Sequence, residues 1–76
     1  FSMKNKFLDE KVISVFDDEK TLDIFSENNI NFIKDLWILK RKNLKDIGLN
    51  DTQINSIIIK LQLHGLDINK KIYSKM

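Results

Sequence analysis

Few of the side chains that carry out catalysis or bind metals occur in this sequence. His64 is the only histidine among 76 residues, cysteine is absent, and no carboxylate precedes His64 at helical spacing. A catalytic site needs an activated nucleophile or a tuned acid–base pair, and a metal site needs several converging ligands. The two glycines, Gly48 and Gly65, are too isolated to form a phosphate-binding loop. The sequence therefore predicts no enzyme and no metal or cofactor site.

The densest charge in the chain is basic and lies near its middle. Four cations fall within six consecutive positions: Lys40, Arg41, Lys42 and Lys45. A cluster of this kind is usually a solvated face. The alternative interpretation is a docking patch for an acidic protein, with RNA, DNA or lipid headgroups as less favoured ligands.

Charge is unevenly distributed along the chain, although the net charge is only +2. Residues 17–35 have a balance of −4, whereas residues 36–49 have a balance of +3. Adjacent segments of opposite sign predict a dipolar surface.

Trp37 stands close to the basic cluster in the sequence. It either fills the core, as tryptophan usually does, or is exposed as an interface anchor.

The composition predicts a single all-α domain over residues 1–76. The chain has 42% hydrophobic and 32% charged residues and no proline, and a chain so poor in turn residues favours helices over many strands. Residues 1–3 could be a remnant of cloning and are given no weight. No apolar stretch approaches the ~20 residues of a membrane span, and no signal peptide is visible. The lack of cysteine suits a reducing compartment, so we expect an intracellular, cytoplasmic protein.

The best-defined element is a helix over about residues 51–64. Asn50 is its predicted N-cap, with Gln53 as the capping-box partner. Gly65 can adopt the left-handed conformation that ends a helix, which places His64 in the last turn. Residues 67–76 are expected to form a basic tail. The apolar stripe of the helix consists of Ile54, Ile57, Ile58 and Leu61.

Shorter helices are predicted upstream of this one. The second is capped by Asp17 or Asp18 and ends at a turn over residues 28–29; the third is capped by Asn31; the fourth spans about residues 41–47 and ends at Gly48. The first is amphipathic, with apolar residues Phe7, Leu8, Val12, Val15 and Phe16. The shared core is expected to contain Ile30, Leu36, Leu39, Leu44, Ile47 and the isoleucines of the last helix.

Two central stretches resemble a known family. Residues 25–31 read FSENNIN, and residues 36–49 read LWILKRKNLKDIGL. Their hydrophobic spacing and single glycine resemble the sterile alpha motif (SAM) domain over about residues 22–61. The resemblance implies a compact SAM-like bundle of about five short helices with a longer C-terminal helix. It also implies a non-catalytic protein–protein interaction module within a larger intracellular protein.

In SAM domains, an end-helix surface of one domain binds a mid-loop surface of its neighbour. Transferred by alignment, the end-helix surface would contain Leu49, Asn50, Asp51, Thr52, Gln53 and Asn55. The mid-loop surface would contain Asn31, Asp35, Trp37, Arg41, Lys45 and Asp46. The usual basic residue is missing from the first surface, and cations have been gained on the second. We therefore expect a monomer or weak dimer alone, with affinity for another SAM domain or a heterologous protein domain.

The chain resembles less closely the C-terminal domain of the bacterial RNA polymerase α-subunit, which has a SAM-like fold. This resemblance rests on Asn29-Ile30, Ile33, Asp35-Leu36 and Gly65-Leu66, with one deletion before Leu49. The DNA-binding positions of that family would fall on Lys20, Asp23, Ser26 and residues 50–53. Asp23 and Asp51 would repel phosphate there. Nucleic-acid binding is therefore ranked below protein binding, as the alternative function.

Overall fold

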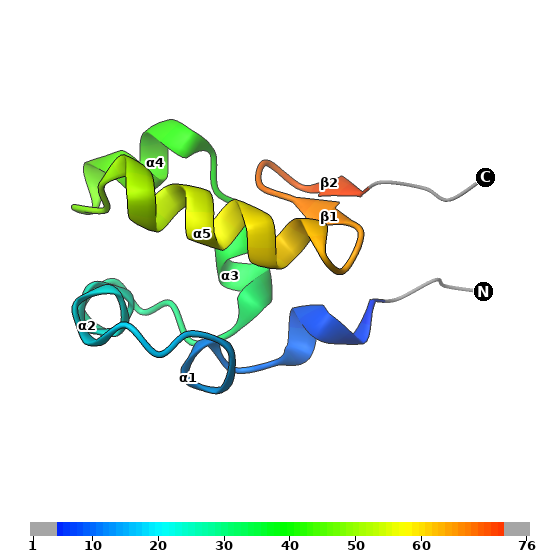
Figure 1. Ribbon diagram of the computed structural model, residues 1–76, viewed down its shortest axis with the longest axis horizontal. Coiled ribbons are helices and arrows are strands. Elements are labelled where there is room, and N and C mark those ends of the chain that lie inside the picture. Colours follow the sequence, from blue (N-terminus) through cyan, green and yellow to red (C-terminus); the bar gives the residue numbers. More distant parts are fainter. Residues whose placement is uncertain (1–4, 73–76) are drawn as a thin grey trace.

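The computed structural model describes residues 5–72, and most elements of this part of the chain are helices packed on one another (Figure 1). The longest helix is the last one, as the sequence predicts. The all-α fold class is thus confirmed, with a small two-stranded sheet added. The elements are the 3-10 helix η1 (Lys6–Asp9), the helices α1 (Val12–Val15), α2 (Glu19–Glu27), α3 (Ile33–Trp37), α4 (Arg41–Asp46) and α5 (Asp51–Gln62), and the strands β1 (Leu66–Asp67) and β2 (Lys71–Ile72).

The start of α5 has the predicted capping box. The Asn50 side chain accepts a hydrogen bond from the backbone N–H of Gln53, and the Gln53 side chain accepts one from the backbone N–H of Asn50, both at 2.8 Å. The regular helix ends at Gln62, two residues earlier than predicted, so His64 lies in the turn that follows. Gly65 has a φ of +76°, the left-handed geometry expected after a helix.

The N-terminal residues form two short helical segments instead of one amphipathic helix. The break falls at residues 10–11, between η1 and α1. There the backbone pairs with the segment before α3: the N–H of Val12 donates to the carbonyl of Asn31 at 3.0 Å, and that of Ile33 to the carbonyl of Glu10 at 2.9 Å. Because these long-range bonds occupy groups that a continuous helix would use internally, the predicted helix is interrupted.

The helix boundaries in the middle of the chain follow local signals, with one exception. Asp18 caps α2, Asn29 has a φ of +58° after it, and Gly48 has a φ of +111° after α4. The exception is Asn31, the predicted N-cap of α3, because the observed N-cap is Phe32. The Asp35 carboxylate, inside the helix, accepts hydrogen bonds from the backbone N–H groups of residues 31 and 32. The N–H of Ile33, one of the donors that an Asn31 cap would serve, donates instead to the carbonyl of Glu10.

The C-terminal segment folds back as a hairpin, although the sequence analysis assigns it to a basic tail. β1 and β2 pair antiparallel, with Leu66 opposite Ile72. The turn of this hairpin bonds to the α3–α4 connection: the N–H of Asn69 donates to the Leu39 carbonyl at 2.7 Å, and that of Lys70 donates to the Trp37 carbonyl at 2.8 Å. Burial of Leu66 and Ile68 fastens the hairpin to the core. Residues 1–4 and 73–76 lie outside the described residues. They include the three N-terminal residues that were given no weight and the remainder of the expected C-terminal tail.

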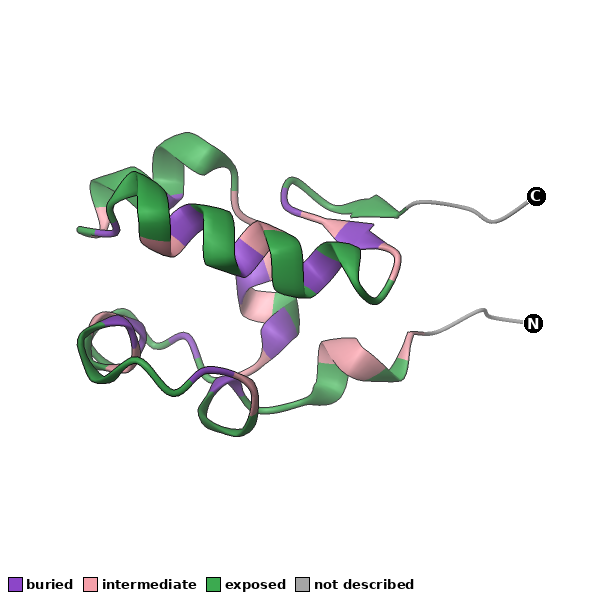
Figure 2. Cartoon of the chain, viewed as in Figure 1, coloured by how far each residue is buried: buried purple, intermediate pink, exposed green. Residues whose placement is uncertain are grey.

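Residues from α1 to the hairpin share one apolar interior (Figure 2). The predicted core residues Ile30, Leu36 and Leu44 are buried, whereas Leu39 and Ile47 are only partly buried. In α5, Ile58 is also only partly covered. The side chains with almost no exposed surface are Phe25, Ile33, Leu36, Leu44, Ile54, Ile57, Leu61 and Leu66. Between residues 5 and 72, no helix has both the length and the hydropathy needed to cross a bilayer.

The cap of α2 makes one carboxylate contribute to stability in a pH-dependent way. The hydroxyl and backbone N–H of Thr21 donate to the Asp18 carboxylate and lower its pKa below the ordinary value. The stability from this carboxylate is therefore present above about pH 3.9, the ordinary Asp pKa, and is lost as the pH falls through the lowered pKa.

We predict that Asp18→Asn flattens the acid limb of the stability curve, which is the fall in melting temperature as the pH is lowered. The reason is that asparagine can cap a helix but does not titrate. The measurement is the melting temperature by circular dichroism from neutral pH down to about pH 2, below the ordinary Asp pKa. Asp17→Asn, which changes the exposed neighbouring carboxylate, is the matched control and should leave the acid limb unchanged. An acid limb that survives Asp18→Asn would contradict the assignment.

Candidate interaction surface

Four side chains from α4 and the start of α5 form a continuous polar cluster, here called the α4–α5 cluster: Arg41, Lys45, Asp51 and Asn55. Arg41 and Lys45 are one helical turn apart and therefore point to the same side of α4. Asp51 and Asn55 have the same relation in α5. The buried Leu49 precedes α5, and the left-handed Gly48 turns the chain between the two helices. The cluster thus depends on the turn that joins α4 to α5.

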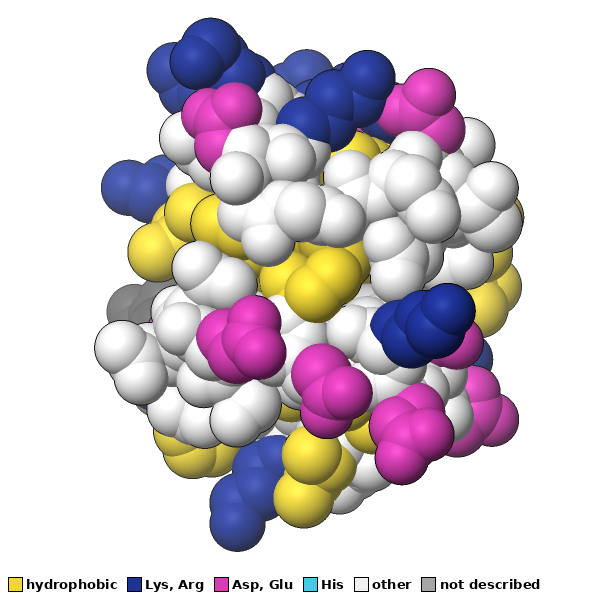
Figure 3. Space-filling model, turned by 90° about the vertical axis from the view of Figure 1, so that its left-hand side faces the viewer, with side chains coloured by type: hydrophobic (Ala, Val, Ile, Leu, Met, Phe, Trp, Pro, Cys, Tyr) yellow, Lys and Arg dark blue, Asp and Glu magenta, His cyan; other side chains and the backbone are white. Residues whose placement is uncertain are grey.

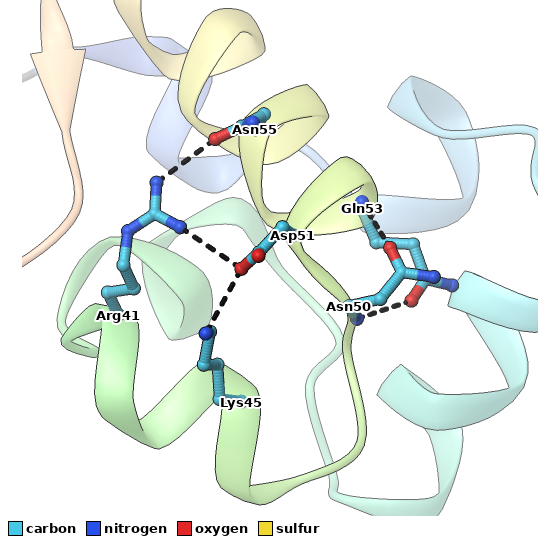
Figure 4. Close-up of polar contacts among 6 residues, drawn as sticks. All are labelled: Arg41, Lys45, Asn50, Asp51, Gln53 and Asn55. Atoms are coloured by element: carbon cyan, nitrogen blue, oxygen red, sulfur yellow. Dashed lines mark hydrogen bonds and ion pairs between the residues drawn. The ribbon is translucent and has the colours of Figure 1, made fainter.

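The Asp51 carboxylate is the centre of the α4–α5 cluster (Figure 4). Its Oδ1 lies 3.2 Å from Nζ of Lys45 and 3.7 Å from a guanidinium nitrogen of Arg41. The other terminal nitrogen of Arg41 donates to the Asn55 side-chain oxygen at 3.0 Å. Asp51 is at the N-terminus of α5, where a negative charge also interacts favourably with the helix dipole. The two cations are therefore held in defined positions by groups of their own chain.

The basic residues remain exposed despite these contacts. Lys40, Arg41, Lys42 and Lys45 are all solvent-accessible, and the side chain of Lys42 is 85% exposed although its Nζ lies 3.5 Å from the Asp46 carboxylate. Surface ion pairs of this kind contribute only about 0–1 kcal/mol each. The intramolecular pairs therefore orient the cations without withdrawing them from a partner.

A second polar network ties α5 to α2. The Gln53 side chain donates to the Thr21 hydroxyl at 3.0 Å, and that hydroxyl donates to the Asp18 carboxylate. Asn50 and Gln53 also satisfy each other in the capping box. These two residues, like the buried Leu49, were candidates for the end-helix surface. Leu49 is buried and Gln53 is partly buried, whereas Asn50, Asp51, Thr52 and Asn55 are exposed.

The candidate mid-loop residues are divided among three places. Arg41 and Lys45 belong to the α4–α5 cluster, and Asp46 is on the same helix. Asp35 and Asn31 lie at the start of α3, where the Asp35 carboxylate receives backbone N–H groups. Trp37 is partly buried at the other end of α3, and its indole N–H donates to the Lys71 carbonyl at 2.9 Å. Trp37 therefore combines both sequence interpretations: it packs on the core and remains partly accessible.

Opposite charges gather on two halves of one end of the molecule. In Figure 3, Lys and Arg side chains lie over α4 at the top, and Asp and Glu side chains lie over α2 below. Residues 17–27, which include α2, contain one cation, Lys20, and five carboxylates: Asp17, Asp18, Glu19, Asp23 and Glu27. The dipolar surface predicted from the sequence is therefore a feature of one face.

A groove of about 460 Å³ separates the α1–α2 connection from the first turns of α5. It brings Lys20 together with three of the DNA-contacting positions expected from the polymerase resemblance, Asn50, Thr52 and Gln53. Asp17 and Asp18 line the same groove. Sequence reasoning missed the remaining lining residues, because they come from separate elements: Val15, Phe16, Thr21, Ser56 and Lys60.

His64 lies away from these surfaces and has a structural environment. Its ring stacks on Phe7 with a centroid distance of 3.6 Å and an interplanar angle of 8°. The Asn5 side chain donates to its backbone carbonyl at 2.8 Å. These contacts attach η1 to the end of α5. Among residues 5–72, no cluster of three or more His, Cys, Asp or Glu side chains is arranged to hold a metal ion.

The class that can be stated for this chain is a small all-α domain with a charged, exposed α4–α5 cluster. Comparisons with protein-family models, with curated proteins and with solved structures find no match to it. Its function is therefore inferred from the geometry of the surface and from the resemblances of its sequence.

Proposed function

We propose that this chain is a SAM-type, non-catalytic protein–protein interaction module of a larger intracellular protein, and that its α4–α5 cluster recognises an acidic protein surface. The observation that carries the proposal is the convergence of Arg41 and Lys45 on Asp51, with both cations still exposed. Cations held in place by a neighbouring carboxylate lose less conformational freedom when a partner carboxylate binds. The arrangement of five helices with the longest one last supports the same module.

The same contacts argue against polymers of the usual SAM kind. A residue of the candidate end-helix surface, Asp51, is paired within the chain to two residues of the candidate mid-loop surface, Arg41 and Lys45. Charges that are already paired within one copy drive association between such surfaces less strongly. A discrete complex is therefore favoured over a continuous chain of domains.

Nucleic-acid binding is the second candidate function, and one observation favours it. Lys20 and Lys60 share a groove with Asn50, Thr52 and Gln53, where amides and cations could contact phosphates. Asp17 and Asp18 line the same groove, and Asp51 is at the centre of the basic cluster. Carboxylates in these places oppose the phosphate backbone that supplies most non-specific affinity, so protein binding remains the preferred proposal.

The two functions can be separated with defined probes. One is a labelled peptide of glutamate and leucine; the others are a DNA duplex and an RNA hairpin. Fluorescence anisotropy at low salt should show binding of the peptide, while nuclear magnetic resonance shift changes should map to α4 and the start of α5. The variant Lys40→Glu/Arg41→Glu/Lys42→Glu should lose this binding. The control Lys6→Glu/Lys11→Glu/Lys71→Glu, which reverses three exposed charges elsewhere, should keep it.

Two results would overturn the proposal. One is binding of the DNA or RNA that weakens steeply with salt and is abolished in the α4 variant, because that behaviour reports phosphate neutralisation. The other is the absence of peptide binding in the unchanged chain. Circular dichroism of each variant establishes that the fold is retained.

A further inference from the structure

One end of the molecule has three adjacent zones of different character. The basic half is built on α4 and the start of α5, where Lys40, Arg41, Lys42 and Lys45 outnumber Asp46 and Asp51, giving a balance of +2. The acidic half is residues 17–27, with a balance of −4. Figure 3 shows both halves in one view, with hydrophobic side chains between them.

The zone between the halves is apolar because α2 meets the α4–α5 turn there. Ile24 of α2 and Ile47 of the turn are both partly buried at the edge of the core. A Cβ placed on Gly48 would lie 3.9 Å from the Cδ1 of Ile24, which shows how closely the two elements approach. We call Ile24 and Ile47 the apolar strip.

We infer that this face binds a second copy of the same chain, and that a two-fold axis along the apolar strip relates the two copies. This inference deepens the proposed function and rests on it. A rotation of 180° about an axis lying in the interface places the basic half of each copy against the acidic half of the other. The two apolar strips then meet at the centre. A self-complementary patch of this kind defines an isologous, closed dimer.

The charge pattern favours this occupant over others. A nucleic acid or an anionic membrane would contact the basic half but would be repelled by the balance of −4 on the acidic half of the same face. A uniformly acidic protein would match only the basic half, and a uniformly basic protein would match only the acidic half. A second copy presents both charges in the required order, and opposite charges across an interface raise the rate and specificity of association.

The size of the face sets the strength of the dimer. The molecule measures 36 × 21 × 17 Å, and this face lies at one end of the longest axis. An end of 21 by 17 Å offers about 350 Å² per copy, which is below the ~800 Å² per partner of a standard stable interface. We therefore expect a weak dimer that dissociates on dilution and on addition of salt.

The test uses two charge-reversal variants, each altering two exposed residues on one half of the face. Lys42→Glu/Lys45→Glu changes the basic half, and Asp23→Lys/Glu27→Lys changes the acidic half. Sedimentation velocity over a concentration series up to about 1 mM, the range of weak association, should show dimers of the unchanged chain. Each variant should weaken dimerisation by roughly tenfold or more, because like charges then face one another. The control Lys6→Glu/Lys71→Glu reverses two exposed charges in η1 and β2, towards the other end of the long axis, and should leave it unchanged.

An equimolar mixture of the two variants provides the decisive result. In a two-fold heterodimer, the new glutamates of one chain face the new lysines of the other, and the remaining native halves also match. The mixture should therefore recover the dimer that neither variant forms alone. A chain that stays monomeric at the highest concentration, a mixture that fails to dimerise, or species that grow beyond a dimer would each overturn the inference.

The experiment also separates this inference from the proposed function. Asp23→Lys/Glu27→Lys should lose self-association but still bind the acidic peptide, because its α4–α5 cluster is intact. Peptide binding together with a monomeric unchanged chain would overturn the dimer alone. A dimer that forms while the acidic peptide does not bind would contradict the recognition of a separate acidic partner.

Discussion

Leu44→Asp is expected to abolish folding at neutral pH. Leu44 is fully buried in the shared core and is the only residue of α4 that is buried. An unpaired carboxylate at this position would lose its hydration with no partner to compensate, and the cost of several kcal/mol is comparable to the whole stability of a small domain, about 5–15 kcal/mol. Far-ultraviolet circular dichroism should show the loss of helical signal and of cooperative melting.

The matched control for this change is Ile59→Asp in α5. Ile59 is 56% exposed, so its replacement leaves the carboxylate hydrated and should keep the melting transition. Ile57→Asp, at a fully buried position of the same helix, should behave like Leu44→Asp. Ile58→Asp should have a smaller effect, because Ile58 is only partly covered. Cooperative melting of the Leu44→Asp protein would show that α4 does not pack as described.

Phe25→Ala is expected to lower the free energy of unfolding by about 3–5 kcal/mol, the usual cost of removing a buried phenylalanine. The ring of Phe25 has no exposed surface, and it makes an edge-to-face contact with Phe16, with centroids 5.6 Å apart. This contact joins α2 to the segment after α1, so truncation leaves a cavity between the two elements.

Urea denaturation followed by tryptophan fluorescence measures this loss. The slope of the free energy of unfolding against urea concentration should stay the same if only stability changes. Phe32→Ala removes a ring of the same size from a partly exposed position and should cost clearly less. Equal losses for the two variants, or a loss below about 1 kcal/mol for Phe25→Ala, would contradict the central place of Phe25 in the core.

Local signals in the sequence were sufficient to predict α5. The cap at Asn50 and Gln53, the apolar spacing from Ile54 to Leu61 and the glycine at position 65 all act over one or two helical turns. Each of them is found in the structure at the predicted residue. A helix defined by neighbours in the chain can be recognised without knowledge of the rest of the fold.

Elements that depend on distant partners were predicted less well. The apolar residues near the N-terminus have helical spacing, but the backbone at residues 10–12 pairs with residues 31–33 and breaks the helix. The hairpin after α5 has strands of only two residues each. It exists because Leu66 and Ile68 are buried and because its turn bonds to the α3–α4 connection. Neither partner segment is near in sequence.

For the candidate surface, the charge of each segment could be predicted from the sequence, whereas the contacts between segments could not. The order of residues along the chain was enough to show that residues 40–45 are basic, that residues 17–27 are acidic, and that the domain would be helical. The packing of α2 and α4 at one end of the bundle decided that these charges share a face. The packing of α4 against α5 decided that Arg41 and Lys45 would meet Asp51. The reason is that Coulomb interactions depend on distance in space, and only the folded chain sets the distance between segments that are far apart in sequence.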